Sequence, residues 1–446
     1  MTRSDRVPSR MRAWIVALFL SGCAITPTDH TPSRGLPPPS REVLANGMRL
    51  IIQEHRAADV VALQLWVGVG GRDEAPGERG FSHLVEHMLF KGTETLGRGF
   101  VDQEVEGVGG RTNAGTSWDY TYYYILLPAA RAARGIDVLA EMAFHSTFDP
   151  DEIDREREVV FEEARLEADN VRTFLDRRLH ELAFDGHAYG FPVLGDPAAL
   201  RGATRATLRG YYARHYVVEN MALVVVGPVN PADVRAAVAR AFGSGPGGAY
   251  VRPLPSRGSD TGRRLVVERP ERQASLGLAW AAPVLGHPDM YAVDLLAQIL
   301  GGSRSSRLNQ ALRERARLVA SIRAGYSALQ LAGLVTVTAQ FERVDEGRVE
   351  AAILDEVRRL RDDGVTPEEL RRAVTASESE HEFSRETVEG LARAWGRAET
   401  LWTLEAERRY LDGIRAVTRD QIRDAARRYL GSSYTRLALQ PRGQTR

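Results

Sequence analysis

The sequence has almost no cysteine. Cys23 is the only one among 446 residues, so a single chain can build neither a disulfide framework nor a cluster of thiolate metal ligands. Lysine is equally scarce, because Lys91 is the only one and arginine supplies nearly all the positive charge. Neither charge sign is in excess, since 59 basic side chains balance 59 acidic ones. This balance argues against nucleic acid or an acidic lipid surface as the main partner.

The apolar run near the start of the chain, Trp14–Leu20, is too short to cross a bilayer, which needs about 20 apolar residues. It follows four arginines and precedes two small residues and Cys23, an order that is typical of a secretory signal over residues 1–23. The ending Leu20–Cys23 resembles a bacterial lipobox, which implies lipidation of Cys23. Ala24 rather than aspartate then implies an outer-membrane lipoprotein that faces the periplasm. The alternative is a cytoplasmic chain with a chance apolar start.

The length of the chain exceeds what one hydrophobic core usually organises, so at least two domains are expected. Residues 24–41 combine prolines with polar residues and predict an extended tether between the lipid and the folded part. Residues 246–262 are rich in glycine and proline and predict a linker. The linker separates a first half at 42–245 from a second half at 263–446.

An internal repeat supports this division into halves. A helical signal beginning at Thr204 and leading to a strand at 221–226 is matched by one beginning at Thr418 and leading to a strand at 436–439. The starts also match, since strand-like runs at 48–52 and 60–69 parallel those at 264–267 and 274–280. We therefore expect an α+β fold of two similar halves, each a mainly antiparallel or mixed sheet covered by helices, forming a clam-like pair. Chance similarity of short amphipathic elements is the alternative.

The main chemical signal is the run His83–His87, which reads His-Leu-Val-Glu-His. We predict a helix from Ser82 to Lys91 that Gly92 stops. Residues four apart share a helix face, so the two histidines can present ring nitrogens to one ion at about 2.0–2.1 Å. Zinc in a hydrolase usually takes three protein ligands and keeps one position open, so a third ligand is required. The alternative is a pair of satisfied core histidines.

These residues resemble the inverted zincins, the M16 peptidase family of pitrilysin and insulysin. The mark of that family is His-x-x-Glu-His with a glutamate ligand about 76 residues downstream, and Glu163 lies 76 residues after His87. The resemblance implies that His83, His87 and Glu163 hold one Zn²⁺ per chain and that Glu86 is the base. It also implies that Glu156, on the same face of a helix that Asp149 and Pro150 begin, supports the site. Glu162 and Glu167 remain alternatives for the third ligand, and manganese, cobalt or iron for the metal.

The resemblance extends over roughly residues 42–440. In the family, the strand that carries an Asn-Ala pair aligns the peptide substrate, which makes Asn113 and Ala114 candidates for substrate contact. Ordinary strand packing is the alternative for this pair. The other matching segments are Asn46–Arg49, Arg72–Glu74, Glu86–Thr93, Thr116, Asp119, Thr121 and Tyr189–Gly190.

One expected residue is missing from the second half. The family pattern has an arginine and, seven residues later, a tyrosine that assists the oxyanion. Arg313 matches, but Ala320 stands at the tyrosine position and has no hydroxyl to donate. Tyr326 has no spacing that lets it substitute. We therefore expect either a related partner chain that supplies an Arg/Tyr pair or weak hydrolysis by this chain alone.

The resemblance as a whole predicts a zinc-dependent endopeptidase or oligopeptidase that hydrolyses peptides or unfolded segments. The missing tyrosine favours the metal-bearing subunit of a heterodimer. The alternative function is a non-catalytic M16-like binding or assembly protein, which usually loses metal ligands.

Overall fold

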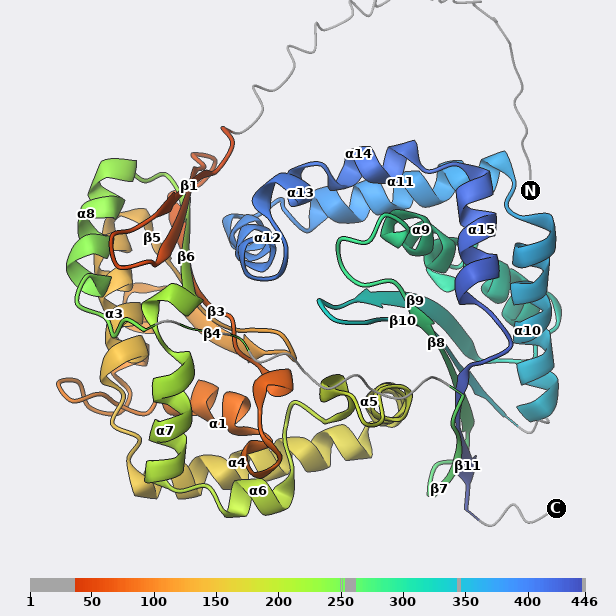
Figure 1. The fold of residues 1–446 in the computed structure, drawn as a ribbon, viewed down its shortest axis with the longest axis horizontal. Coiled ribbons are helices and arrows are strands. Elements are labelled where there is room, and N and C mark those ends of the chain that lie inside the picture. Colours follow the sequence, from red (N-terminus) through yellow and green to blue (C-terminus); the bar gives the residue numbers. More distant parts are fainter. Residues whose placement is uncertain (1–36, 249, 251, 253–261, 343–345, 443–446) are drawn as a thin grey trace, which may run out of the picture. The chain divides into compact units, whose positions relative to one another are not determined.

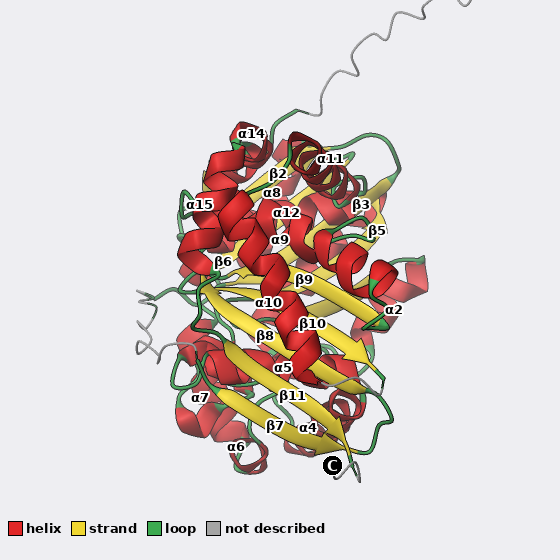
Figure 2. Cartoon of the chain, turned by 90° about the vertical axis from the view of Figure 1, so that its right-hand side faces the viewer, coloured by secondary structure: helices red, strands yellow, loops and turns green. Residues whose placement is uncertain are grey.

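Two β-sheets with the same strand order organise the chain. The computed structural model describes residues 37–248, 250, 252, 262–342 and 346–442. The first sheet runs β1-β2-β6-β3-β5-β4 and the second β7-β11-β8-β10-β9. Without β1 the two orders correspond strand for strand, and in each sheet only the first pairing is parallel. The predicted α+β fold of two similar halves is therefore confirmed, and Figures 1 and 2 show the strands side by side.

Each strand-like run predicted from the sequence overlaps a strand of the structure. The strands are β1 (Ser40–Val43), β2 (Arg49–Glu54), β3 (Val60–Val67), β4 (Arg111–Thr116), β5 (Thr121–Pro128), β6 (Met221–Gly227), β7 (Arg264–Arg269), β8 (Ala274–Ala282), β9 (Ser321–Ala328), β10 (Gly333–Phe341) and β11 (Thr435–Pro441). The helices are α1 (Phe81–Met88), α2 (Phe100–Val105), α3 (Ala132–His145), α4 (Pro150–Asp169), α5 (Val171–Ala183), α6 (Pro197–Arg201), α7 (Arg205–His215), α8 (Pro231–Phe242), α9 (Met290–Gly301), α10 (Glu346–Asp363), α11 (Pro367–Phe383), α12 (Val388–Leu401), α13 (Leu404–Arg408), α14 (Tyr410–Ala416) and α15 (Arg419–Tyr429). A π-helix at Asn309–Arg315 precedes β9.

Strand β6 shows why the first sheet is covered on both faces. All seven of its residues are buried, and a continuous apolar strand of this kind is typical of a sheet packed on both sides. Met221, Leu223 and Val225 point into the core that the first-half helices cover. The alternate residues between them belong to a separate apolar cluster that also contains Leu391 and Trp395 of α12.

The halves exchange one helix each. Helix α12 belongs to the second half but packs on β3 and β6 of the first sheet. Helix α5 belongs to the first half but packs on β8 and β11 of the second sheet, where Leu175 and Leu179 contact Leu437 and Leu439. Figure 1 shows both helices beside the sheet of the other half. Each sheet therefore has one face that is covered by a helix of the other half.

One predicted domain boundary changes. The tether was expected to reach residue 41, but Ser40 and Arg41 already pair with β2 in strand β1, because a backbone next to a sheet edge gains hydrogen bonds there. The signal at 1–23, Cys23 and most of the tether lie outside the described residues, as does most of the linker at 246–262. No helix among the described residues is long and apolar enough to cross a membrane.

Candidate metal centre

Helix α1 presents His83, Glu86 and His87. A buried carboxylate begins the helix, because Glu74 accepts hydrogen bonds at 2.8 Å from the backbone N–H groups of Gly80 and Ser82. Carboxylates stabilise helix N-termini by satisfying donors that have no partner within the helix. The helix ends at Met88, three residues before the predicted end at Lys91. The turn that follows closes with two hydrogen bonds back to the last turn of the helix.

Helix α4 lies beside α1 and supplies the acidic side chains. As predicted, the Asp149 side chain accepts hydrogen bonds from the first backbone N–H groups, and Pro150 occupies the first helical position. Glu156 and Glu163 are seven residues apart and face α1, where both approach a histidine. The packing of the two helices thus joins segments about 76 residues apart along the chain.

Three predicted ligands come together. One donor atom from each of His83, His87 and Glu163 lies within 4.8 Å of the other two. Glu163 Oε2 lies 3.6 Å from His83 Nε2 and 3.8 Å from His87 Nε2. Ligands of a tetrahedral zinc with bonds of about 2.0–2.1 Å are about 3.4 Å apart. The two Glu163 distances are within a few tenths of an ångström of that spacing, so the residue types and the arrangement of the three side chains fit a zinc site.

The two alternative glutamates point elsewhere. Glu162 is solvent-exposed and pairs with Arg165 at 2.7 Å. Glu167 lies 3.8 Å from Arg177 and lines a neighbouring cavity. Among the described residues, neither joins the group formed by His83, His87 and Glu163. The geometry thus favours Glu163 as the third ligand.

Hydrogen bonds orient the second histidine. Nδ1 of His87 lies 3.0 Å from Glu156 Oε2, and Lys91 Nζ lies 2.8 Å from Glu156 Oε1. Burial alone would raise the pKa of Glu156, but the hydrogen bonds from His87 and Lys91 lower it, so the carboxylate stays charged. An acceptor at Nδ1 fixes the tautomer that leaves Nε2 free for a metal.

The two histidines differ in their electrostatics. Burial lowers the pKa of His83 to about 3, helped by the neighbouring His87, so His83 is neutral as a metal ligand must be. Burial would also lower the pKa of His87, but the hydrogen bond to Glu156 and the charges of Glu163 and Glu86 raise it. Protons and a cation therefore compete for His87 more than for His83.

Glu86 is held for proton transfer. It is nearly buried, with 9% of its surface exposed, and Thr116 at the end of β4 donates a 2.5 Å hydrogen bond to its Oε2. Burial raises the pKa of Glu86, and the Thr116 hydrogen bond partly opposes this shift. A carboxyl with a raised pKa can both accept and release a proton near neutral pH.

Strand β4 carries Asn113 and Ala114 at the edge of the first sheet. Within the described chain β4 pairs only with β5, so its outer backbone groups face away from the sheet. Asn113 is exposed and Ala114 half-buried. The strand ends at Thr116, which contacts Glu86, so its free edge leads to the base.

The second-half residues of the sequence prediction lie apart from this group. Arg313 sits in the π-helix, and its only described ion pair is with Glu314 at 4.0 Å. Ala320 is exposed and directly precedes β9, and its backbone N–H donates a hydrogen bond to the Gln340 carbonyl. Tyr326 of β9 lines a cavity together with Thr116, but its hydroxyl donates to the Pro283 carbonyl at 2.6 Å. No described contact joins these three residues to the predicted ligands.

Sequence reasoning missed two supporting residues. Lys91 was expected only as the end of a helix in a matching segment, and Thr116 only as a matching residue, yet Lys91 holds Glu156 and Thr116 holds Glu86. The retention of a single lysine just after the motif was the available signal for Lys91. No local pattern signals the contact of Thr116 with Glu86, because it depends on how β4 packs against α1.

The second half places other side chains at corresponding positions. Helix α9 is the first helix after β8, as α1 is after β3, and α11 begins with a proline as α4 does. Asp294 and Gln298 are four residues apart on α9, and both line a cavity of about 370 Å³ with Glu380 of α11. The Tyr410 hydroxyl donates to Asp294. The one histidine that lines this cavity among the described residues, His381, has its Nε2 against the Arg385 guanidinium, and no group of three possible ligands forms there, so this is a poor zinc site.

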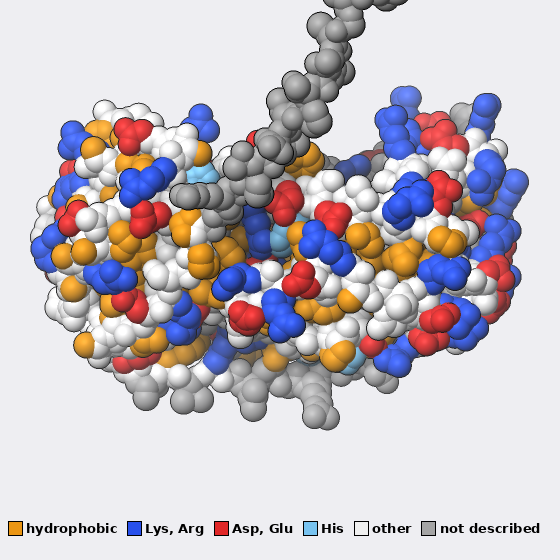
Figure 3. All heavy atoms as spheres, turned by 90° about the horizontal axis from the view of Figure 1, so that it is seen from above, with side chains coloured by type: hydrophobic (Ala, Val, Ile, Leu, Met, Phe, Trp, Pro, Cys, Tyr) orange, Lys and Arg blue, Asp and Glu red, His pale blue; other side chains and the backbone are white. Residues whose placement is uncertain are grey.

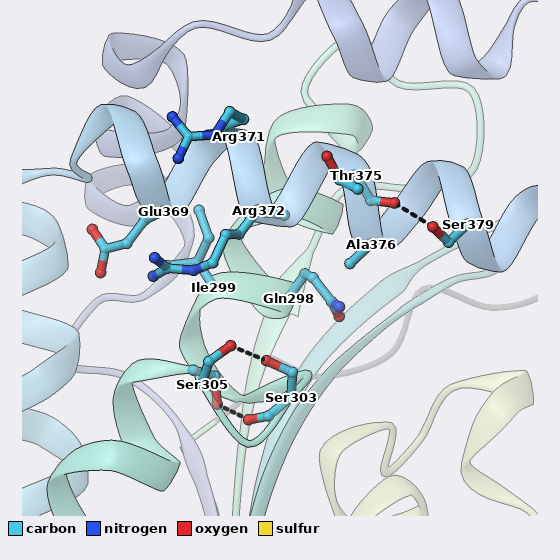
Figure 4. Close-up of a pocket in the computed structure, with 12 residues that line it drawn as sticks. Gln298, Ile299, Ser303, Ser305, Glu369, Arg371, Arg372, Thr375, Ala376 and Ser379 are labelled. Atoms are coloured by element: carbon cyan, nitrogen blue, oxygen red, sulfur yellow. Dashed lines mark hydrogen bonds between the residues drawn. The ribbon is translucent and has the colours of Figure 1, made fainter. Parts of the chain in front are cut away.

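Two further hollows lie near the surface. A cavity of about 370 Å³ between α9 and α11 is lined by hydroxyl and arginine side chains, among them Ser303, Ser305 and Arg372 (Figure 4), and contains none of the predicted site residues. A larger cavity of about 620 Å³ contains Thr116 and Glu167 and therefore adjoins the metal centre. On the face seen in Figure 3, positive and negative side chains are mixed, in keeping with the balanced composition.

One helix carries His-x-x-Glu-His and faces a second helix that carries carboxylates, and both belong to a scaffold of two repeated sheets. This arrangement is that of a metallopeptidase-like centre of the inverted zincin type. The chain belongs to peptidase family M16. A family model described as "Insulinase (Peptidase family M16)" matches residues 49–197, and one described as "Peptidase M16 inactive domain" matches residues 202–377.

Relatives along nearly the whole chain carry protease names. An uncharacterized zinc protease of Mycobacterium tuberculosis (strain H37Rv) is 31% identical over 419 residues, which cover 92% of this chain and 94% of that protein. The uncharacterized zinc protease YmxG of Bacillus subtilis is 29% identical over 415 residues, which cover 90% of this chain and 98% of that protein.

Solved structures share the fold. A protease from Helicobacter pylori superposes with a TM-score of 0.86 at 24% identity and covers 91% of this chain and 100% of its own. A peptidase M16 inactive domain from Pseudomonas fluorescens superposes with a TM-score of 0.85 at 20% identity and covers 92% of this chain and 99% of its own.

Proposed function

We propose that this chain is a zinc-dependent endopeptidase or oligopeptidase that hydrolyses peptides or unfolded segments. The observation that supports this most strongly is the convergence of His83, His87 and Glu163 beside the buried carboxylate of Glu86. Zinc bound there supplies a Lewis acid that polarises the scissile carbonyl and promotes ionisation of the attacking water.

The side chains of this chain divide the remaining work. Glu86 removes a proton from the attacking water and delivers it to the leaving amine, a transfer suited to a carboxyl whose pKa burial has raised. Thr116 holds the Glu86 carboxylate in place through its hydroxyl. Glu156 holds the His87 ring through Nδ1.

The free edge of β4 aligns the substrate. An extended peptide can add to an exposed sheet edge through backbone hydrogen bonds, with alternate side chains entering pockets. Asn113 and Ala114 lie on this edge, two and three residues before Thr116. A peptide paired along the strand therefore passes the base at its end.

A second chain of the same family completes the site. Ala320 has no hydroxyl where the family pattern has a tyrosine, and loss of one oxyanion donor typically costs about 10²–10³ in rate. We therefore assign the Arg/Tyr pair to the partner, and lipidation at Cys23 holds the complex on the outer membrane facing the periplasm. Strong hydrolysis by the isolated chain would contradict the partner. Recovery of a Cys23→Ala variant from the membrane fraction would contradict the anchor.

Metal analysis and peptide cleavage test the central proposal together. His83→Ala, His87→Ala and Glu163→Ala should lose the single zinc as well as activity, because each removes a ligand. Glu86→Gln should keep the zinc and lower the rate about 10²–10⁴-fold, because it removes only the base. Plasma mass spectrometry and cleavage of a quenched fluorescent peptide measure the two quantities. Glu162→Gln, on the same helix, should change neither, and full activity in Glu86→Gln would refute the role of the base.

A further inference from the structure

The cavity of about 620 Å³ beside the metal centre is the place where a substrate side chain can enter. Thr116, which holds Glu86, lines one side of it, and Glu167 lies one helical turn beyond Glu163. Helix α5 and strands β9 and β10 form other walls, with apolar side chains such as Leu179 and Leu334 among them. Pockets that combine apolar walls with a few polar groups are typical of ligand sites.

The charges that line the cavity do not cancel. Its lining contains three arginines and two carboxylates. Arg323 pairs with Asp176, and Arg177 pairs with Glu181 outside the lining and lies 3.8 Å from Glu167. Arg172 is exposed and forms no ion pair or hydrogen bond with another residue of the described chain. Arg172 is therefore the arginine of the lining that has no anionic partner among the described residues.

His180 does not add to this charge. Its ring stacks on Trp118 with 4.0 Å between centroids, and its Nε2 is buried without a hydrogen-bond partner among the described residues. Burial lowers the pKa of His180 to about 3, so the ring is neutral near pH 7. Among the described residues that line the cavity, Arg172 is thus the cation without an anionic partner, and it lies in the first turn of α5, where the helix N-terminus adds a partial positive charge.

We propose that Arg172 binds a carboxylate of the substrate in this cavity and thereby makes the peptidase select substrates with an acidic group near the scissile bond. This proposal specifies the substrate class of the proposed peptidase and rests on that proposed function. A guanidinium matches a carboxylate with two parallel hydrogen bonds. The carboxylate comes from an aspartate or glutamate side chain or from the peptide C-terminus.

Binding without turnover tests the assignment. Zinc-loaded Glu86→Gln chain is titrated with fluorescent peptides in which one glutamate is moved position by position, each matched with its glutamine twin and made with a free or an amidated C-terminus. We expect the carboxylate member of one pair to bind about tenfold more tightly, as measured by fluorescence anisotropy. Charge-assisted hydrogen bonds are stronger than neutral ones by a free energy that corresponds to about this factor in affinity. Dependence on the side chain or on the C-terminus identifies the source.

Substitution then assigns the preference to one side chain. Arg172→Ala should remove it, and Arg172→Glu should reverse it toward lysine-containing peptides. Arg178→Ala is the matched control, because Arg178 lies on the same helix, pairs with Glu181 at 2.9 Å and does not line the cavity. A preference that survives Arg172→Ala, or no difference within any peptide pair, overturns the proposal.

The outcomes separate this inference from the peptidase function. If the preference depends on Arg172 but neither the zinc-loaded wild-type chain nor its complex with the proposed partner cleaves any of the peptides, hydrolysis is refuted and the carboxylate site stands. If cleavage occurs with equal kcat/KM for glutamate and glutamine peptides, the carboxylate site is refuted and hydrolysis stands.

Discussion

Glu156 acts on the metal centre through His87. Its two oxygens are shared between His87 Nδ1 and the ammonium group of Lys91. The lysine keeps the carboxylate charged, and the carboxylate keeps the imidazole turned with Nε2 toward Glu163. The only lysine of the chain is thus the outermost member of a three-residue relay that ends at the metal site.

Removal of the relay should weaken metal binding without removing a ligand. Glu156→Ala should lower zinc affinity about 10–100-fold, the usual cost of losing the partner of a metal-bound histidine. Lys91→Gln should act in the same direction and more weakly. Competition with a chromophoric chelator measures both, and exposed Glu158→Ala on the same helix is the control. Unchanged affinity in Glu156→Ala would show that α1 packing alone orients His87.

A second residue-scale effect is an acid-sensitive ion pair in the other half. Glu369 accepts two hydrogen bonds from Arg307, at 2.7 and 2.8 Å. Burial alone would raise the pKa of Glu369, but these bonds and the backbone N–H of Thr366 lower it to about 2. A lowered folded-state pKa stabilises the fold above the unfolded value near 4.5, and this contribution is lost as pH falls toward 2.

The pair predicts a pH-dependent stability difference. Glu369→Gln should lower the free energy of unfolding at pH 7 by at most about 3 kcal/mol, from 1.36 kcal/mol per pKa unit. The gap to wild type should shrink between about pH 4.5 and 2. Urea unfolding at several pH values measures it. Glu368→Gln, whose partner Arg372 is exposed, should show little change, and a gap independent of pH would exclude the titration of Glu369.

At the scale of elements, the exchanged helix α12 depends on a close approach. Gly396 faces Trp66 of β3, and a Cβ built on the glycine would lie 2.0 Å from Trp66 Nε1. Trp66 is fully buried, and its Nε1 donates to Gln64 at 3.0 Å. The indole therefore has no room to move, and only glycine lets α12 lie this close to the first sheet.

A methyl group at this position should separate helix from sheet. Gly396→Ala should lower the free energy of unfolding by about 1–3 kcal/mol through overpacking, although alanine favours helix. Gly210→Ala in α7 is the matched control, because the nearest atom to its added Cβ is the end of the Arg214 side chain at 3.8 Å. That variant should gain about 0.5–1 kcal/mol. Thermal unfolding compares the two, and equal stabilisation would show that α12 shifts freely.

At the scale of the whole molecule, Arg252 contacts both halves. Arg252 donates to both oxygens of Asp73 at 2.8 and 2.9 Å and to the Asp119 carbonyl at 2.6 Å. It also donates to Gln330 Oε1, in the turn between β9 and β10, at 3.0 Å. Asp73 has only 1% of its side chain exposed. Arg252, which lies in the predicted linker, thus connects the two halves through hydrogen bonds.

Removal of that arginine should loosen both halves together. Arg252→Ala should lower the free energy of unfolding by up to about 3–5 kcal/mol, because the buried Asp73 carboxylate loses both Arg252 hydrogen bonds and keeps only Arg72 at 3.6 Å and the Gly70 N–H. Denaturant unfolding and limited proteolysis measure the effect. Arg235→Ala, which breaks an exposed pair with Glu42, should change stability by at most about 1 kcal/mol. A loss in Arg252→Ala no larger than in this control would show that helix exchange alone holds the halves.

Some features of this protein could be predicted from its sequence because they depend on residues close together along the chain. The spacing of His83, Glu86 and His87 has the same meaning on any helix, because residues four apart share a face whatever the helix packs against. The capping pattern at Asp149 and the matching helix starts at Thr204 and Thr418 are equally local, and the structure has all three caps. The matching strand runs at the start and end of each half followed from the same short-range signals, but the order of the strands within each sheet did not.

Only the tertiary structure decided what depends on packing between distant segments. It placed Glu163 rather than Glu162 or Glu167 beside the histidines, because the rotation of α4 against α1 determines which side chains face the site. It exchanged α5 and α12 between the sheets and left Arg172 beside a cavity without a partner in the described part of the chain. Periodicity shows which face of an element is apolar, but not which other element will cover it.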